Sequence, residues 1–284
     1  MSKYLITGGK GMLAYAIINH PFFKDHCACD VEDFNICDKD QMVSVLEKEK
    51  PEYVINCAAY TDVTKAETEY DKAYQINATG AKNLAELSLA YQFKLIHIST
   101  DFVFPGNKEI EKSENDETQP VNAYGKSKLE GEVFVNAIAK DHLILRVSWL
   151  YGPNGRNFVS IISQLIKTKD ELNIVADQYG KTTYTVDVAE VLSHLITKQA
   201  NGIYHFANQG VSSRYEFTQE IYRLIKEYEE VDCTIKPMKA IDYPDPTPRP
   251  SYSVLNTDKI SQLIDKPRHW RSALSDYIDL IYSK

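Results

Sequence analysis

The sequence contains no apolar run that approaches the ~20 residues needed for a membrane-spanning helix. It begins Met1-Ser2-Lys3 and passes directly into a β-rich apolar stretch, which leaves no room for a signal peptide. Internal repeats and low-complexity tails are also absent. We therefore expect a cytoplasmic protein that is not embedded in a membrane.

Cysteine is scarce, and the spacing of the five cysteines contains no CxxC pair and no zinc pattern. An odd count without such motifs is typical of reduced thiols in a cytosolic protein. We therefore expect free thiols and no metal site. The cysteines are Cys27, Cys29, Cys37, Cys57 and Cys233.

Positive charge is in deficit. The formal net charge is -8, which argues against a broad surface that binds nucleic acid. A small nucleotide ligand is still compatible with this charge, because local backbone dipoles can hold a single pyrophosphate. The charge therefore argues against nucleic acid as a partner and is compatible with a nucleotide as a ligand.

The chain otherwise has an ordinary globular composition. Hydrophobic residues make up 43% and charged residues 25% of its 284 residues, which suits one large domain or two closely packed ones. In the first half, apolar stretches predict strands at residues 3–7, 27–30, 53–56, 94–98 and 142–147. They alternate with helices expected at residues 11–20, 38–50, 71–92 and 123–140. This alternation predicts an α/β fold with a doubly wound parallel sheet covered by helices on both faces.

The pattern is less regular after about Trp149. Helices are expected at residues 157–167, 186–198, 215–228, 258–264 and 271–281, and strands at residues 172–176 and 203–206. The segment 241–250 contains Tyr-Pro-Asp-Pro-Thr-Pro-Arg-Pro and is expected to lack regular structure. We predict a first domain over residues 1–150 and a smaller substrate-side lobe over residues 151–284, some of whose elements return to the sheet.

A glycine-rich loop, Gly8-Gly9-Lys10-Gly11, joins the first expected strand to the first expected helix. Glycine permits the positive φ angles of a sharp turn and lets the backbone approach a pyrophosphate at the helix N-terminus. Gly8 and Gly11 have the spacing of the short-chain reductase loop, and the third position of the fingerprint accepts Ala14. The loop therefore predicts a Rossmann domain whose cofactor contacts include Gly8, Lys10, Gly11, Met12 and Leu13.

Two residues near this loop bear on the choice of cofactor. Asp30 ends the second expected strand, close to the ~20-residue offset of an acid that binds the adenosine ribose, and favours NAD. Lys10 favours NADP if it pairs with a 2′-phosphate, but it can also be a solvated loop lysine. We expect NADPH or NADH, with NADP slightly favoured. Asp38 precedes a helix, where it can serve as an N-cap, contact adenine, or do both.

The third expected strand is followed by Cys57-Ala58-Ala59-Tyr60. Small residues there either leave room for a flat cofactor at the carboxyl edge of the sheet or simply pack tightly. We interpret all four as cofactor contacts. Asn77 is polar on an otherwise apolar helix face, where it is either a buried structural residue or one that orders the site. We favour the structural interpretation.

The strongest catalytic signal is Tyr124 with Lys128, because residues four apart lie on the same side of a helix. A nearby ammonium favours the phenolate and lowers a tyrosine pKa from its usual ~10, so that the phenol can exchange a proton with a carbonyl oxygen. The lysine can also hold the nicotinamide ribose. Thr100 follows the strand before this helix, where its hydroxyl can donate a hydrogen bond to a substrate carbonyl. The order of glycine loop, hydroxyl-bearing strand end and Tyr-x-x-x-Lys indicates a catalytic set.

Further motifs extend over nearly the whole chain. They include Ser-Thr-Asp-x-Val-Phe at residues 99–104 and Arg-x-Ser-Trp at residues 146–149, with stretches at 56–63, 65–67, 124–132, 150–152, 177–180 and 249–250. With them the sequence resembles the extended short-chain dehydrogenase/reductases, and within these it is most similar to the dTDP-4-dehydrorhamnose reductase family. The first two motifs are specific to that branch.

The resemblance implies reduction of the 4-keto group of dTDP-4-dehydro-β-L-rhamnose to dTDP-β-L-rhamnose, a precursor of cell-surface polysaccharide, with hydride from NADPH or NADH. It implies that Tyr124 supplies the proton, that Lys128 tunes Tyr124 and holds the ribose, and that Thr100 polarises the carbonyl. Asp101 and Trp149 would line the sugar site. Trp149 can instead be a core residue at a domain interface. Lys65, which belongs to the motif at residues 65–67, either approaches the substrate or pairs with a carboxylate.

Two positions depart from the family pattern. Some members use a glutamate just after the glycine loop to bind magnesium between subunits, whereas this chain has Tyr15-Ala16, so no such metal is expected. The pattern Asp-Gln-x-Gly-x-Pro-Thr has Thr182 in place of its proline. A monomer or homodimer that binds a dTDP-deoxysugar, with no nucleic-acid or membrane partner, is expected.

Two alternatives remain open. The first is a nucleotide-sugar epimerase or dehydratase of the same superfamily. Such enzymes often carry extra carboxylates beside the threonine, and here Asp101 is next to Thr100. The second is a non-catalytic binding protein, like the regulatory subunit of methionine adenosyltransferase. The presence of Thr100, Tyr124 and Lys128 together favours an enzyme.

Overall fold

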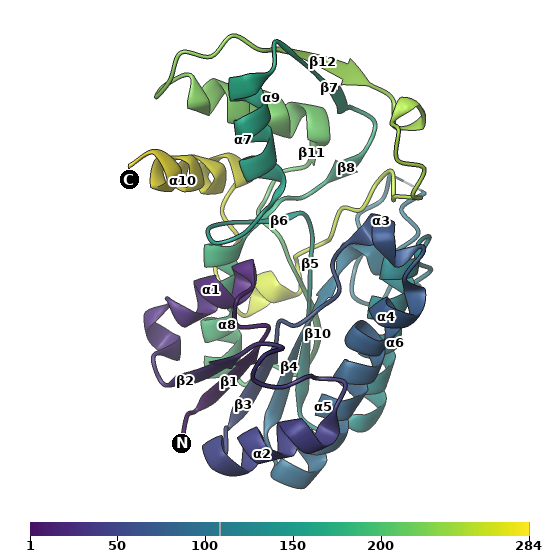
Figure 1. Cartoon of the computed structure of the whole chain (residues 1–284), viewed down its shortest axis with the longest axis vertical. Coiled ribbons are helices and arrows are strands. Elements are labelled where there is room, and N and C mark those ends of the chain that lie inside the picture. The colour runs from purple at the N-terminus through teal and green to yellow at the C-terminus, as the bar shows by residue number, and fades with distance from the viewer. Residues whose placement is uncertain (108, 284) are drawn as a thin grey trace.

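A parallel sheet of six strands forms the centre of the protein, in the order β10-β5-β4-β3-β1-β2 (Figure 1). The computed structural model describes residues 1–107 and 109–283. The strands are β1 (Tyr4–Thr7), β2 (His26–Cys29), β3 (Tyr53–Asn56), β4 (Lys94–Thr100), β5 (His142–Val147) and β10 (Gly202–Phe206). After β1, the chain forms β2 on one side of β1. It then crosses over and forms β3 on the other side of β1. The carboxyl ends of β1 and β3 therefore flank a topological switch point, where open α/β sheets bind ligands.

Helices cover both faces of this sheet, which confirms the predicted doubly wound α/β fold. On one face, α1 (Met12–Ile18) and α8 (Thr185–Thr197) contribute to one apolar core. On the other face, α2 (Lys39–Glu49), α5 (Gly80–Tyr91) and α6 (Ala123–Ile138) contribute to a second core. Every residue of β1 and β5 is buried, as expected for strands covered on both sides.

The helix expected over residues 71–92 is interrupted, so this prediction was wrong in detail. It consists of α4 (Tyr70–Tyr74), one π-helical turn (Gln75–Thr79) and α5. The turn lies against α6, where a Cβ atom on Gly131 would stand 2.3 Å from the Asn77 carbonyl oxygen. The Asn77 side chain bonds the Tyr60 backbone at 2.8 and 3.0 Å and donates to Ser127 Oγ at 2.9 Å. Asn77 thus braces the loop after β3 against α6, in line with the structural interpretation.

The remaining elements form a smaller lobe above the carboxyl edge of the sheet (Figure 1). It contains α7 (Phe158–Thr168), α9 (Arg214–Ile225) and α10 (Trp270–Tyr282), which share a core, and the parallel pair β7 (Glu171–Val175) and β12 (Thr234–Met238). Two-residue strands complete it: β6 (Leu150–Tyr151) with β9 (Thr183–Tyr184), and β8 (Tyr179–Gly180) with β11 (Ser212–Ser213). Between these elements, α8 and β10 return to the large sheet.

Other sequence expectations for this lobe need correction. The helix expected over residues 258–264 is only a short 3₁₀ helix (Ile260–Gln262). The proline-rich segment does lack regular structure from residue 243 onward, but a 3₁₀ turn (Ala240–Asp242) precedes the prolines. That turn is held by the Ala240 N–H, which donates to Asp177 Oδ1 at 2.8 Å. Strand β12 was not expected, because its pattern Thr-Ile-Lys-Pro-Met contains a proline.

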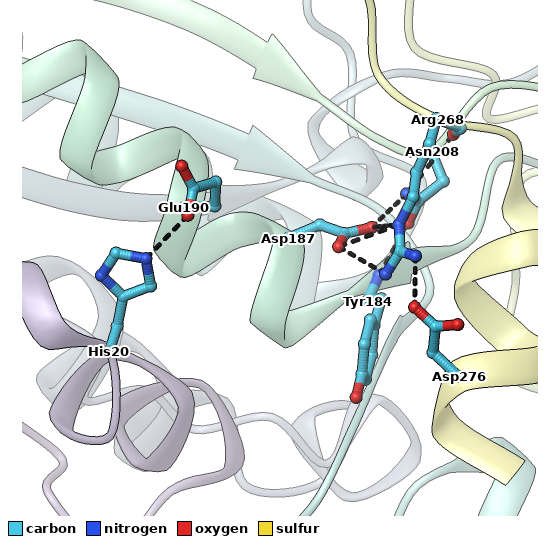
Figure 2. Close-up of polar contacts among 7 residues, drawn as sticks. All are labelled: His20, Tyr184, Asp187, Glu190, Asn208, Arg268 and Asp276. Carbon is cyan, nitrogen blue, oxygen red and sulfur yellow. Dashed lines mark hydrogen bonds and ion pairs between the residues drawn. The ribbon is translucent and has the colours of Figure 1, made fainter. Parts of the chain in front are cut away.

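Ion pairs connect the layers, as Figure 2 shows. The Arg268 guanidinium makes a fork to Asp187 at the start of α8, with Nε–Oδ2 and Nη2–Oδ1 distances of 2.9 and 2.8 Å, and also pairs with Asp276 of α10. A second contact, His20 Nε2 to Glu190 Oε2 at 2.8 Å, joins the segment after α1 to α8. The smaller lobe is therefore anchored to the helix layer of the large sheet by charge as well as by packing.

In the parts of the chain that the structure describes, no helix combines the length and apolar character needed to cross a membrane.

Candidate active site

A cavity of about 720 Å³ opens at the switch point, between the carboxyl ends of the central strands and the smaller lobe. Its walls come from the glycine loop, the ends of β2, β3 and β4, the first turns of α6, and the loop at residues 147–157. Its size lies within the ~300–1,000 Å³ range of small-molecule and cofactor sites. The cavity therefore unites segments that the sequence separates by more than a hundred residues.

The glycine loop has the shape of a backbone cradle. Gly8 has a φ of +64°, and a Cβ atom on it would stand 2.8 Å from the Ala58 backbone nitrogen. Helix α1 begins next to Gly11, which provides no side-chain cap, so the first N–H groups of the helix have no side-chain acceptor. Met12 and Leu13 line the cavity. This end of the cavity fits a pyrophosphate, whose oxygens can accept from those N–H groups.

Most of the predicted cofactor contacts lie together in this cavity. Its lining includes Gly8, Lys10, Gly11, Met12, Leu13, Asp30, Cys57, Ala58, Ala59, Tyr124 and Lys128. Asp38 and Tyr60 are not part of the lining. Asp38 is the N-cap of α2, where its Oδ1 accepts from the Asp40 N–H at 3.0 Å. The Tyr60 hydroxyl points elsewhere and donates to Glu69 Oε2 at 3.1 Å.

Tyr124 lies beside Thr100 because α6 packs closely on the end of β4. A Cβ atom on Gly125 would stand only 2.3 Å from the carbonyl oxygen of Phe102, so only glycine allows this approach. The Asn122 side chain caps α6 by accepting from the Gly125 N–H at 2.8 Å. Thr100 is buried at the end of β4, and its hydroxyl donates to Asp101 Oδ1 at 3.1 Å. Both predicted catalytic hydroxyls therefore line one wall of the cavity.

Lys128 is buried one turn further along α6, and its ammonium donates to the carbonyl oxygen of Ile98 at 2.7 Å. Burial lowers the pKa of Lys128 to about 8, although Glu132 opposes this shift. Burial raises the pKa of Tyr124 to about 12, with the Thr100 hydroxyl acting in the opposite direction. The sequence predicted that Lys128 lowers the pKa of Tyr124. Burial instead raises that pKa, and the Lys128 ammonium lies at the Ile98 carbonyl oxygen.

The two residues expected at the sugar site also line the cavity. Asp101 is buried, its Oδ2 has no hydrogen-bond partner among the described residues, and burial raises its pKa to about 6. Trp149 has a φ of +46°, and its ring lies between Gly180 and the guanidinium of Arg214. A Cβ atom on Gly180 would be 2.6 Å from Trp149 Cε2. Trp149 is thus held at the junction of the two lobes and still reaches the cavity.

The sequence reasoning missed Arg214, the first residue of α9. Its guanidinium carbon lies 3.5 Å from the centre of the Trp149 ring and 4.8 Å from that of Phe158. Burial lowers its pKa to about 9, and Asp101 opposes this shift, so the group is charged at neutral pH. No described carboxylate forms an ion pair with it. The capping box at Ser213 and Glu216 marks the start of α9 and was the available signal for the position of this cation.

A contact of Lys65 bears on the two alternatives that the sequence left open for it. Lys65 forms an ion pair with Asp62 at 3.5 Å, which is the carboxylate alternative. The five cysteines are free thiols. The described residues contain no group of three or more His, Cys, Asp or Glu side chains arranged to hold a metal ion.

The glycine cradle at a switch point, together with the Thr100–Tyr124–Lys128 wall, defines a nucleotide-binding protein of the short-chain dehydrogenase/reductase class. Solved structures agree on this fold. The UDP-glucose 4-epimerase of Thermus thermophilus, in complex with NAD, has a TM-score of 0.82 at 18% identity, over 97% of both chains. At that identity the likeness concerns the fold alone.

The particular family follows from the match over residues 2–283 to the model described as RmlD substrate binding domain: the chain belongs to this family. It is 38% identical to the spore coat polysaccharide biosynthesis protein SpsK of Bacillus subtilis, over 98% of this chain and 97% of the relative. It is 35% identical to a dTDP-4-dehydrorhamnose reductase of Aggregatibacter actinomycetemcomitans, over 97% of this chain and 98% of the relative.

The structure of a dTDP-4-dehydrorhamnose reductase from Bacillus anthracis, in complex with NADP, has a TM-score of 0.93 at 33% identity. That match covers 98% of this chain and 99% of the other.

Proposed function

We propose that this protein is an NAD(P)H-dependent reductase that converts dTDP-4-dehydro-β-L-rhamnose to dTDP-β-L-rhamnose. The observation that carries the proposal is a single cavity in which a pyrophosphate cradle lies at one end and two hydroxyls, Thr100 and Tyr124, lie on one wall. A hydride donor held by the cradle and a proton donor on the wall can therefore meet the same substrate carbonyl there. The relatives named as dTDP-4-dehydrorhamnose reductases support the same substrate.

In this proposal the cofactor is held by the glycine loop, by the small residues Cys57-Ala58-Ala59 and by Lys128. When bound, it supplies a hydride to the carbonyl carbon at position 4 of the sugar. Thr100 would turn its hydroxyl from Asp101 Oδ1 and donate to the carbonyl oxygen instead, which increases the positive character of that carbon. Tyr124 gives its phenolic proton to the same oxygen, so that the carbonyl becomes a hydroxyl. Lys128 holds the nicotinamide ribose next to Tyr124.

The substrate end is proposed to lie against Trp149, Asp101 and Arg214. The Arg214 guanidinium is a desolvated cation without a carboxylate partner among the described residues, which suits the diphosphate that links the deoxysugar to thymidine. Trp149, which lines the cavity between Gly180 and Arg214, is proposed to lie against the sugar. Asp101 lines the same cavity and is proposed to lie next to the sugar hydroxyls. Residues 1–150 then form the cofactor domain, and residues 151–284 form the substrate lobe apart from α8 and β10.

The test is a reaction with purified protein and the keto substrate made from dTDP-glucose by the preceding pathway enzymes. We expect one NADH or NADPH to be oxidised per sugar reduced. Tyr124→Phe is expected to lose ~10²–10⁴-fold in turnover, the usual contribution of general acid catalysis, while cofactor affinity is retained. Sugar turnover without net oxidation of the cofactor would refute the reductase and indicate an epimerase or dehydratase. Near-normal turnover by Tyr124→Phe would refute the assigned proton donor.

A further inference from the structure

The end of the cavity beyond the glycine loop has a carboxylate fixed in its wall. Asp30 follows the last residue of β2 and lines the cavity together with Val31. Its Oδ2 accepts from the Lys10 N–H at 2.8 Å, and its Oδ1 accepts from the Val31 N–H at 2.8 Å. In a fold of this type, the acid at the end of the second strand faces the 2′ position of the adenosine ribose. Backbone bonds therefore hold this carboxylate at the place where NAD and NADP differ.

The cation next to this carboxylate is already paired. Lys10 Nζ donates to Glu32 Oε1 at 2.6 Å, across the loop that follows β2. The hydrogen bond raises the pKa of Lys10 and lowers the pKa of Glu32, so both groups are charged at neutral pH. A lysine in this loop would otherwise be the natural partner of a 2′-phosphate. Here its charge is balanced by a carboxylate of the same chain.

A third carboxylate makes the surroundings of the ribose position negative. Asp33 Oδ2 accepts from the Asp30 N–H at 2.8 Å, so Asp33 lies on the same turn. Asp30, Glu32 and Asp33 thus surround the ammonium of Lys10, with Asp30 in the cavity lining and the other two on the turn beside it. Arg156 also lines the cavity, from the smaller lobe, and two residues before it the Asn154 side chain donates to the Lys10 carbonyl at 3.2 Å.

Resting on the proposed function, we propose that this acidic corner selects NADH over NADPH, and that Glu32 is the specificity-determining residue. Glu32 retains Lys10 in an ion pair and adds its own negative charge. A 2′-phosphate, which carries nearly two negative charges, then meets repulsion from three carboxylates without a free lysine. The 2′-hydroxyl of NADH carries no charge and donates a hydrogen bond to Asp30. Because the corner is solvent-exposed, the electrostatic difference is moderate, on the order of tenfold in affinity.

The experiment measures binding of NADH and of NADPH to the full chain by nicotinamide fluorescence, in the absence of sugar. The wild type is expected to bind NADH roughly tenfold more tightly than NADPH. Glu32→Gln is expected to tighten NADPH binding about fivefold and to leave NADH within about twofold, because it removes one charge and releases Lys10. Adding Lys10→Met to Glu32→Gln should abolish most of that gain. Glu52→Gln, which removes an exposed partner of Lys3 outside the cavity, is the matched control and should change neither affinity.

Wild-type protein that binds NADPH as tightly as NADH would overturn the inference and leave the reductase proposal intact. The same holds if Glu32→Gln changes both affinities equally, or if Arg156→Gln rather than Glu32→Gln changes their ratio. Binding of neither nicotinamide would instead overturn the proposed function, and the inference with it.

Discussion

The buried ion pair between Glu132 and Arg146 offers the sharpest prediction about stability. Glu132 projects from α6 and Arg146 from β5, and both side chains are only 3% exposed. Arg146 donates from Nε to both Glu132 oxygens at 2.9 and 3.1 Å, and from Nη2 to Oε2 at 2.6 Å. The next polar neighbour of Arg146 is His205. Burial lowers the pKa of His205 to about 3, so its ring is neutral and does not add a second positive charge beside Arg146.

Replacing Glu132 by glutamine keeps the size of the side chain and removes the charge that balances Arg146. Breaking a buried pair by removing one partner costs ~3–5 kcal/mol, since it leaves an uncompensated buried charge. We expect a loss near the lower end, about 3 kcal/mol, because the amide oxygen still accepts one hydrogen bond. Urea unfolding should show a lower midpoint with an unchanged slope.

The matched control is Glu229→Gln. Glu229 accepts from Lys167 at 2.7 Å, but the two side chains are 38% and 37% exposed. An exposed pair of this kind contributes at most about 1 kcal/mol. If Glu132→Gln loses no more stability than Glu229→Gln, the reasoning about desolvated charge is refuted. Glu132 also raises the pKa of Lys128, so in Glu132→Gln the alkaline decline of activity should move to lower pH.

Three further predictions concern the site. Activity should decline as pH rises through about 8, because the buried Lys128 has its pKa lowered to about 8 and loses its charge there; a profile that is flat to pH ~10, the ordinary value for lysine, would contradict this. Gly8→Ala should weaken cofactor binding at least ~10-fold, because Cβ would stand 2.8 Å from backbone and φ is +64°. Gly202→Ala is the matched control, because Gly202 also has a positive φ, +87°, but no atom lies within 4 Å of the added Cβ. It should strain the backbone and leave cofactor affinity unchanged in the same titration. Gly180→Ala should displace the Trp149 ring and raise the KM for the sugar more than it lowers kcat; an unchanged KM would exclude Trp149 from the sugar site.

Local sequence patterns were sufficient for the elements and for part of the site. The apolar stretches predicted all six strands of the large sheet, with bounds that differ from the observed ones by at most two residues. The glycine spacing predicted the turn after β1, because the backbone conformation at Gly8 is a local requirement. Likewise, the i, i+4 spacing placed Tyr124 and Lys128 on one side of a helix whatever the rest of the chain does.

Interactions between distant segments were not predictable in the same way. The π-helical turn depends on contact with α6, and the pairing of β12 with β7 overrides a proline in the strand. Asp38 and Tyr60 have sequence positions compatible with a cofactor site. In the structure, however, the Asp38 side chain caps α2 and the Tyr60 hydroxyl bonds Glu69.

The sequence by itself therefore determined the strands and helices of the α/β fold and the glycine loop, and it placed the proposed catalytic side chains on one side of a helix, since each depends on conformations within a few residues. The tertiary structure decided which groups surround them. It placed Arg214 over Trp149, paired Lys10 with Glu32, and set the pKa values of Tyr124 and Lys128 by burial. Burial and charge pairing depend on segments far apart in the chain, and only the topology of the sheet and the docking of the second lobe bring those segments together.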